Sequence, residues 1–223
     1  MNANVDVRDV PLHVDTRQQR ALLEALAATA IGHALELGEL DRAIGDGDHG
    51  ANLMRGFQAV GAHIDELSAM PLDEALRDVG KRLVLNVGGA SGPLYGTFFM
   101  VLGAELGSKE PLTRRRLFAA FDAAVAGLKA RGKSDVGAKT MLDVLAPVVA
   151  ELNAEGSDLL RRLRERAHRA ALATVPMRAL RGRAAFLGER SIGHMDPGAR
   201  SSQLLVDAVC ATLLGDVSDT YAG

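Results

Sequence analysis

The sequence predicts an all-α protein. Aromatic residues make up only 4% of the 223 residues, whereas strands favour aromatic and β-branched side chains. Ala, Leu and Arg, which are good helix formers, are abundant, and apolar residues recur at steps of three and four. Because the connections between these periodic segments are short, sequential helices should be antiparallel neighbours in an up-and-down bundle or a closed ring.

The first periodic segment begins at a helix-capping residue, Asp15 or Thr16, and ends near Gly38. Its apolar positions are Leu22, Leu23, Leu26, Ala30, Ala34 and Leu37. Similar segments occupy about 50–66, 72–87, 91–106, 112–131, 138–153, 156–180 and 200–215, separated by Gly, Pro, Ser or Asp. The pattern therefore predicts about eight helices.

Two long stretches lack apolar periodicity, 38–50 and 181–200. Both are rich in glycine and charged residues, and long loops of this kind carry function more often than packing. We expect the candidate site in these two stretches.

Composition limits the class of protein. A formal charge of −2 leaves no general positive field for nucleic acid or anionic lipid, so we expect neither partner. No apolar run approaches the roughly 18 residues of a membrane helix, and the acidic N-terminus is unlike a signal peptide, which predicts a cytoplasmic protein. A single cysteine, Cys210, excludes a disulfide framework. We expect one domain over residues 1–223, with a flexible segment at 1–14.

Two phosphate-binding motifs occur in an unsuitable context. Gly45–Gly50 reads G-x-G-x-x-G, with Asp65 at the spacing of a dinucleotide fingerprint, but no β-branched strand precedes it. Residues 127–134 match the P-loop pattern G-x-x-x-x-G-K-S, yet the residues before them have helical spacing. We interpret the second match as a helix end, with Gly132 in the cap and Lys133 near the negative end of the dipole.

Three carboxylates, Asp41, Asp46 and Asp48, lie within eight residues and are separated by glycines that allow a tight turn. They would repel one another without a cation. Mg²⁺ fits such a site because it takes oxygen ligands and shares them with substrate phosphates. A calcium loop of the EF-hand type does not fit, because Phe57 stands where a bidentate Glu is required. An acidic turn that only caps the next helix is the alternative.

A second glycine-rich loop, 88–96, opens another predicted helix, whose amides and the Ser91 hydroxyl suit a phosphate. Close packing of small residues would explain this loop equally well. The last loop contains Arg181, Arg183, Arg190 and Arg200, which could contact phosphate or pair with nearby acids. His49 and His194 could each be a phosphate contact, a general base or a spectator. No Ser/His/Asp order or Cys/His pair stands out in the sequence, so we do not expect nucleophilic catalysis.

Taken together, four segments resemble the family of nucleotide-binding L subunits of dihydroxyacetone kinase, the DAK2 domain family. They are ELDRAIGDGDHGANLMRGF, NVGGASGPLYGTFF, GAKTMLDVLAPVV and GRAAFLGERSIGHMDPGARSS, in the family's order over nearly the whole chain. The resemblance implies a closed antiparallel barrel of eight helices, with ADP or ATP and two Mg²⁺ ions bound by the loops at one end.

The resemblance also implies roles for individual residues. Asp41, Asp46 and Asp48 match the family's magnesium ligands. The matches to its nucleotide contacts are His49, Gly50, Ala51, Asn52, Ala90, Ser91, Gly132, Met141, Arg183, Asp196, Pro197 and Gly198. One position departs from the family pattern: Ala138 stands where G-D-K-T-M has an acid, so any role of that acid is in doubt here.

The activity implied is phosphoryl transfer by positioning and electrostatics to a small ketose. The ketose and its binding histidine would be on a separate K subunit, and no catalytic residue is identified in this chain. ADP would be retained and rephosphorylated by a phosphocarrier of the phosphotransferase system. A kinase that uses free ATP, acting on erythrulose or another ketose, and a non-catalytic metal-binding or regulatory module remain alternatives. The oligomeric state is left open, a homodimer included.

Overall fold

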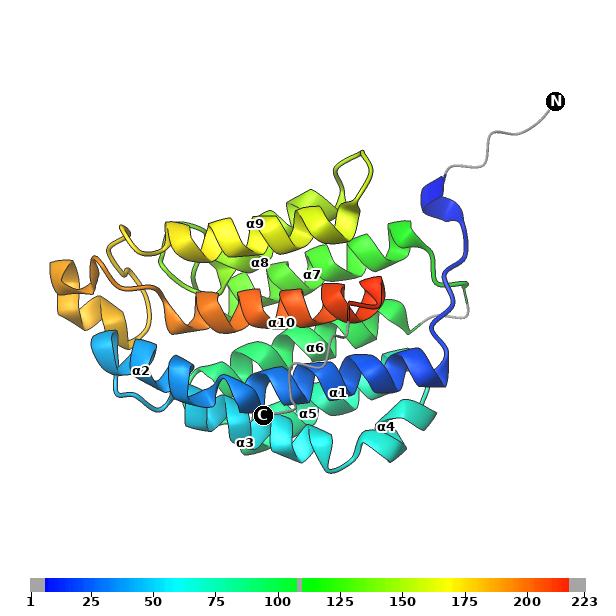
Figure 1. Cartoon of the computed structure of the whole chain (residues 1–223), viewed down its shortest axis with the longest axis horizontal. Coiled ribbons are helices and arrows are strands. Elements are labelled where there is room, and N and C mark those ends of the chain that lie inside the picture. Colours follow the sequence, from blue (N-terminus) through cyan, green and yellow to red (C-terminus); the bar gives the residue numbers. More distant parts are fainter. Residues whose placement is uncertain (1–6, 108–109, 217–223) are drawn as a thin grey trace.

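The structure is a computed structural model that describes residues 7–107 and 110–216. Within these ranges it contains helices and no strand (Figure 1). The elements are η1 Val7–Asp9, α1 Thr16–Gly32, α2 Ala34–Ile44, α3 His49–Gly61, α4 Ile64–Ala69, α5 Leu72–Asn86, α6 Ser91–Leu106, α7 Arg114–Gly132, α8 Leu142–Leu152, α9 Leu159–Ala173, η2 Arg183–Ser191 and α10 Pro197–Leu214.

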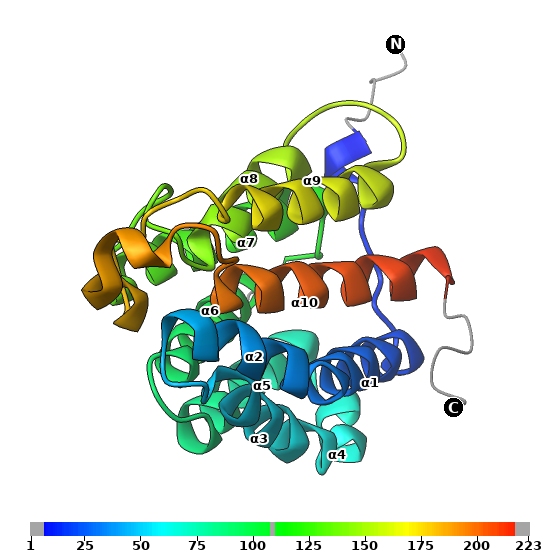
Figure 2. The ribbon, with the colours of Figure 1, turned by 60° about the vertical axis from the view of Figure 1, so that its left-hand side comes forward.

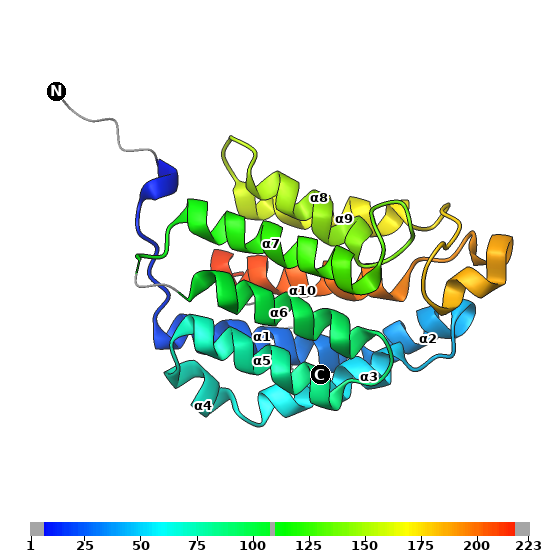
Figure 3. The same cartoon turned by 180° about the vertical axis from the view of Figure 1, so that it is seen from behind.

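Eight of the described helices form a closed ring in the order α1, α3, α5, α6, α7, α8, α9, α10, and α10 packs back against α1. Neighbours in the ring run antiparallel, as Figures 1 and 3 show. Buried apolar side chains fill its interior, among them Phe57, Leu83, Phe99, Leu128 and Leu142. The predicted all-α ring of antiparallel helices is confirmed, with α2 and α4 as additional short helices.

The chain turns sharply between α1 and α2, where the sequence predicts one continuous helix to Gly38. The helix axes bend by 52° between Gly32 and Ala34. The prediction of a loop from residue 38 is also wrong, because α2 continues to Ile44. Leu37, Asp41 and Ile44 face inward at helical spacing, but the carboxylate of Asp41 interrupts the apolar pattern by which a helix is detected.

Within the ranges described, no single helix has the length and apolar character needed to cross a membrane. Only α1 and α2 taken together, despite their bend, meet the length and composition criteria.

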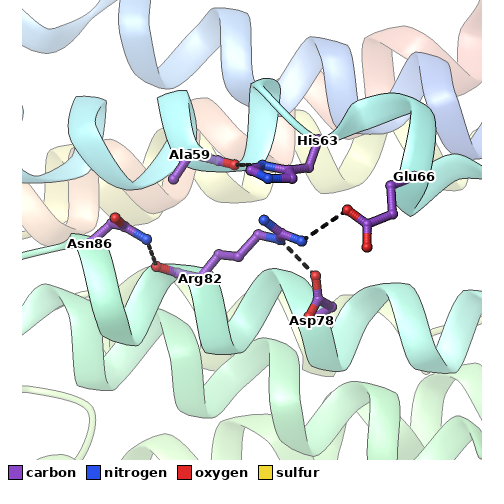
Figure 4. A network of polar contacts seen from close by, with 6 residues as sticks. All are labelled: Ala59, His63, Glu66, Asp78, Arg82 and Asn86. Carbon is purple, nitrogen blue, oxygen red and sulfur yellow. Dashed lines mark hydrogen bonds and ion pairs between the residues drawn. The ribbon is translucent and has the colours of Figure 1, made fainter.

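The predicted helix over 50–66 is divided in the same way into α3 and α4. Arg82 of α5 fastens α4, because its guanidinium contacts Asp78 of the same helix at 2.6 Å and Glu66 of α4 at 3.3 Å (Figure 4). At the end of α3, His63 Nδ1 donates to the carbonyl oxygen of Ala59 at 3.0 Å. The break at residues 62–63 lets α4 fold back along α5.

The two ends of the described chain differ from the sequence expectation in detail. Residues 1–6 of the segment expected to be flexible lie outside the described residues. After them, the Leu12 N–H donates to the carbonyl oxygen of Leu112 at 2.7 Å, and Asp9 lies 2.7 Å from Arg115. Near the other end, the helix expected over 156–180 is shorter, α9, and the expected loop 181–200 contains η2 and the start of α10.

Four helices of the ring, α3, α6, α8 and α10, begin at the same end of the molecule, where α2 and η2 also lie (Figures 1 and 2). Alternation of direction around an antiparallel ring produces this arrangement. Unpaired N–H groups and the positive ends of helix dipoles therefore gather at this end.

Candidate functional site

Three carboxylates meet where α2 ends and α3 begins. Asp41 lies in the last turn of α2 and is buried, while Asp46 and Asp48 lie in the turn that follows. One oxygen from each carboxylate lies within 4.8 Å of the others. Gly47 makes the turn between them with φ of +78°, which glycine adopts without strain. A set of three convergent carboxylate oxygens suits Mg²⁺, which coordinates oxygen at close range.

His49 connects this carboxylate group to the first turn of α3. Its backbone N–H donates to Asp41 Oδ2 at 3.1 Å. Its ring is 8% exposed and lies between Ser91 Oγ at 2.9 Å and Ser201 Oγ at 3.0 Å. Burial lowers the pKa of His49, although the carboxylates of Asp41 and Asp48 act in the opposite direction.

Gly50 allows α3 to begin directly against α2. A Cβ atom at Gly50 would lie 1.9 Å from the carbonyl oxygen of Ala34 and 2.8 Å from the backbone nitrogen of Gly38. Real Cβ atoms do not approach backbone atoms this closely, so only glycine fits. The close crossing of the two helices sets Asp41 beside the N–H groups of α3.

The second glycine-rich loop lies next to this helix start. Asn52 of α3 is buried and packs under the loop, because its Oδ1 atom lies 2.7 Å from where a Cβ of Gly88 would be. Ala90 precedes α6, and Ser91 is its first residue. The N-termini of α3 and α6 are thus held side by side through the contact between His49 and Ser91, and unpaired N–H groups at helix N-termini bind anions.

A cleft of about 500 Å³ opens between the end of α7 and the chain that follows α9. Its lining residues are Lys129, Lys133, Ser134, Asp135, Val136, Gly137, Ala138, Leu180 and Arg181. Gly132 packs close to Leu94 in the first turn of α6, where a Cβ would be 3.4 Å from Leu94 Cδ2. The cleft therefore adjoins the start of α6.

The last loop closes this end of the ring. The guanidinium of Arg183 lies 2.9 Å from Asp46 Oδ2. Asp196 caps α10, since its Oδ2 accepts from the Ala199 N–H at 2.7 Å. Burial, with a smaller contribution from the carboxylates of Asp143 and Asp41, raises the pKa of Asp196 to about 7, although the Ala199 N–H and the Lys139 ammonium act in the opposite direction. The α10 start also contacts the α8 start, because a Cβ at Gly198 would lie 3.6 Å from Met141 Cβ.

The structure places the sequence-predicted residues at this one end of the ring, on α2, α3, α6, α7, η2 and α10 and on the loops that join them. Ala51 is exposed on the first turn of α3, and Pro197 is the first residue of α10. The roles of these residues toward metal and nucleotide remain predictions.

Neither of the two phosphate-binding motifs, Gly45–Gly50 and residues 127–134, follows a strand in the structure. Helix α2, not a strand, precedes Gly45–Gly50, and helix α7 contains the start of the P-loop match. Lys133 is the left-handed cap of α7, with φ of +46°, and its N–H donates to the Lys129 carbonyl. The interpretation of residues 127–134 as a helix end is confirmed, but the expected cap is wrong, because Gly132 is the last helical residue and Lys133 takes the left-handed cap position.

Two buried charged residues near the site, Lys139 and Asp143, lie in the segment GAKTMLDVLAPVV but are given no role by sequence reasoning. Lys139 has no exposed surface, and its Nζ donates to the carbonyl oxygens of Thr174, Met177 and His194. Asp143 accepts from the N–H groups of Gly137 at 2.5 Å and Thr140 at 2.7 Å. The loop amides beside Ala138 thus have a carboxylate partner in this chain. Charged residues within an apolar helix pattern are the only signal that could have indicated Lys139 and Asp143.

Comparison with known proteins agrees with this geometry. The sequence matches the DAK2 domain over residues 43–211. It is 44% identical over 176 residues to the ADP-binding subunit DhaL of PEP-dependent dihydroxyacetone kinase 1 from Listeria innocua, covering 79% of this chain and 86% of the relative. It is 40% identical over 173 residues to the ADP-binding subunit DhaL of the PEP-dependent kinase from Escherichia coli K12, covering 75% and 82%.

A solved structure shares the fold. The dihydroxyacetone kinase from C. freundii, in complex with AMP-PNP and Mg²⁺, superposes with a TM-score of 0.71 and 26% sequence identity. The match covers 94% of this chain but only 36% of that longer chain. With the family match over most of the sequence and two relatives at 40% identity or more, the chain belongs to the DAK2 domain family.

Proposed function

We propose that this chain is the nucleotide-holding subunit of a kinase for dihydroxyacetone or another small ketose. The observation that carries the proposal is the convergence of Asp41, Asp46 and Asp48 within 4.8 Å, directly beside the N-termini of α3 and α6. Carboxylates repel the phosphates of a nucleotide unless cations lie between them. Carboxylates beside anion-binding helix ends are therefore the arrangement expected for a magnesium–nucleotide complex.

The side chains present fit the proposed ligands. Asp41, Asp46 and Asp48 offer oxygen donors for the two Mg²⁺ ions, and the first-turn N–H groups of α3, α6 and α10 offer donors for a diphosphate. The adjoining cleft of about 500 Å³ is large enough for part of a nucleotide. Bound Mg²⁺ would neutralise the charge that develops on the phosphates during transfer.

The residues of this chain act by holding and orienting. Gly50 lets α3 approach α2, so that the His49 N–H fixes one oxygen of Asp41. Arg183 is exposed on η2 and contacts Asp46, so it can reach a phosphate near the carboxylates. The hydroxyls of Ser91 and Ser201 contact the two ring nitrogens of His49, so within the described residues no carboxylate holds the other side of the ring as the third group of a nucleophile triad does. Covalent catalysis by this chain is therefore not proposed, and the transfer depends on positioning.

The relatives named above are ADP-binding subunits, and we extend three of their features to this chain. A separate K subunit would bind the ketose through a histidine and dock against the nucleotide end. ADP would stay bound and be rephosphorylated by a phosphocarrier of the phosphotransferase system, since the relatives' kinases are PEP-dependent. Such a system operates in the cytoplasm. The chain could also form a homodimer, which a measurement of the molar mass of the purified protein in solution would test.

Retained ADP is the first property to measure. The purified chain is denatured without added nucleotide, and released ADP and magnesium are quantified by chromatography and elemental analysis. We expect near-stoichiometric ADP and about two Mg²⁺ per chain. An empty chain that binds ATP and Mg²⁺ only on addition would support a kinase using free ATP, and one that binds neither would contradict the proposal.

Two substitutions identify the phosphate-binding segment. Asp46→Asn should remove bound Mg²⁺ and nucleotide. Lys133→Ala should leave Mg²⁺ bound and at most weaken the nucleotide, because Lys133 lines the cleft but caps a helix and does not follow a strand. Asp65→Asn is the matched control, since this side chain is 92% exposed and pairs with Arg20. The reverse pattern, with loss only in Lys133→Ala, would indicate that residues 127–134 act as a P-loop. Metal binding without transfer in the presence of K and a phosphoryl donor would indicate a regulatory module.

A further inference from the structure

A continuous set of hydrogen bonds joins α3, α6 and α10 inside the ring, and we propose that it fixes His49 as the tautomer with its proton on Nε2. The members are His49, Ser91, Tyr95, Ser201 and Ser202, referred to below as the hydroxyl relay. Four of them are nine-tenths or more buried, with exposures of 8% for His49, 3% for Tyr95 and 1% for each of Ser201 and Ser202. Ser91, at the outer end of the relay, is half-buried.

The direction of the bonds follows from one carbonyl group. Ser201 Oγ lies 3.1 Å from the carbonyl oxygen of Gly198, a group that can only accept, and the proposal assigns the single hydroxyl hydrogen of Ser201 to this bond. The other two neighbours of Ser201 Oγ must then donate to it. They are the Tyr95 hydroxyl at 2.8 Å and His49 Nε2 at 3.0 Å.

The rest of the relay follows without conflict. With its proton on Nε2, His49 has a bare Nδ1 that accepts from the Ser91 hydroxyl at 2.9 Å. The Tyr95 hydrogen is used on Ser201, so Ser202 Oγ donates to the tyrosine oxygen at 3.1 Å. Every hydroxyl donates once, and no two donors face each other. A buried polar network that is satisfied in this way holds one arrangement.

This arrangement assigns a different role to Ser91 from the one its position alone suggests. Its hydroxyl hydrogen points inward to His49, so toward a ligand Ser91 offers lone pairs, and phosphate binding at this helix depends on backbone N–H groups. In this arrangement both nitrogens of the His49 ring face hydroxyl groups of the relay. His49, Ser201 and Tyr95 are thus positioning residues that hold three helix N-termini together. This role rests on the proposed function, whereas the tautomer does not.

The tautomer is measured directly by ¹⁵N NMR of the imidazole rings in the full chain, with His49 assigned from the signals lost in His49→Gln. We expect a pyrrole-type shift at Nε2 and a pyridine-type shift at Nδ1, with or without ADP and Mg²⁺. Ser201→Ala removes the acceptor of the Nε2 proton and should change the shifts toward the other tautomer. Tyr95→Phe is the matched control, because it removes a different donor to Ser201 and should leave the tautomer unchanged.

A proton on Nδ1 in the unsubstituted chain would overturn the proposal, and so would unchanged shifts in a folded Ser201→Ala variant. If Ser201→Ala does not fold, the unsubstituted chain and Tyr95→Phe still decide the tautomer. Binding of ADP with Mg²⁺ tests the Ser91 assignment. If the Ser91 hydrogen points to His49, Ser91→Ala should change the dissociation constant of ADP by about threefold or less. If the hydroxyl donated to phosphate instead, its loss would weaken binding about tenfold or more. Absence of nucleotide binding in every form would contradict the proposed function and leave the tautomer result standing.

Discussion

Asp196 is the buried carboxyl group whose ionisation should be most visible in the stability of the protein. Its pKa is raised to about 7 in the folded chain, compared with about 3.9 in an unfolded one. Between these values the folded protein holds a proton that the unfolded chain releases. The free energy of unfolding therefore falls as pH rises from about 4 to about 7, by an amount on the order of 4 kcal/mol, and is constant above that range.

Asp196→Asn should remove this dependence and still cap α10, because Asn caps helices as well as Asp does. We expect the variant to gain stability relative to the unsubstituted chain as pH rises through that window, measured by urea unfolding at about pH 5 and about pH 8 in metal-free buffer. Asp65→Asn, at an exposed position, should show no such gain. Parallel pH curves for Asp196→Asn and the unsubstituted chain would show that the buried carboxyl is ionised throughout.

Lys139 is the residue that fastens the last loop. Its fully buried ammonium donates to carbonyl oxygens at 2.8 Å from Thr174 and 3.1 Å from Met177, and also to that of His194. Lys139→Met keeps the length of the side chain but leaves these acceptors without a donor, which should lower the free energy of unfolding by about 3 kcal/mol. Hydrogen exchange should quicken in residues 174–196. Lys81→Met, on the exposed face of α5, should change neither quantity.

At the scale of single residues, the sequence indicated the groups with a characteristic spacing and missed those defined by burial. Asp41, Asp46 and Asp48 are close in sequence, so their meeting follows from a tight turn. His49 and Ser201 are 152 residues apart, and their contact depends on how the ring closes. Lysine is ordinarily a surface residue, and only the carbonyl oxygens of the chain between α9 and α10 make Lys139 an internal donor.

At the scale of elements, the crossing of α2 and α3 is the feature most sensitive to a single methyl group. Gly50→Ala would place its Cβ 1.9 Å from the Ala34 carbonyl oxygen. Because this contact is with the backbone of α2, it can be relieved only by moving α2 and α3 apart. We expect destabilisation of about 1–3 kcal/mol or more, with loss of metal binding as Asp41 moves away from α3. Thermal unfolding and magnesium titration measure the two effects.

Gly61→Ala on the same helix is the matched control. A Cβ there would meet only Ala27 Cβ, at 3.8 Å, which is ordinary van der Waals contact. Because alanine is the better helix former, this variant should be as stable as the unsubstituted chain or more stable by up to about 1 kcal/mol. Equal destabilisation by both substitutions would show that the effect of Gly50→Ala comes from helix propensity and not from the crossing.

At the scale of the whole molecule, periodicity predicted the ring because each of its helices buries one apolar face. The same reasoning failed where a polar side chain faces inward, as Asp41 does in α2, and where the chain bends without losing its pattern, as at His33 and His63. The closure of α10 against α1 has no local signal. The short connections left an up-and-down bundle and a closed ring both open, and the resemblance to a family favoured the closed barrel.

The same architecture predicts how ligand removal affects the entire fold. The site is assembled from the connections α2–α3, α5–α6, α7–α8 and η2–α10, which the unfolded chain separates, so Mg²⁺ and nucleotide should bind the folded chain alone. At a ligand concentration of 100 times the dissociation constant this stabilises the fold by about 2.7 kcal/mol, or about 5–10 °C in Tm for a chain of this size. Dialysis against EDTA should lower Tm by that amount, and added Mg²⁺ with ADP should restore it. Asp46→Asn should show the Tm of the EDTA-treated protein both with and without added Mg²⁺ and ADP. If EDTA leaves the Tm of the unsubstituted chain unchanged, the three carboxylates hold no metal.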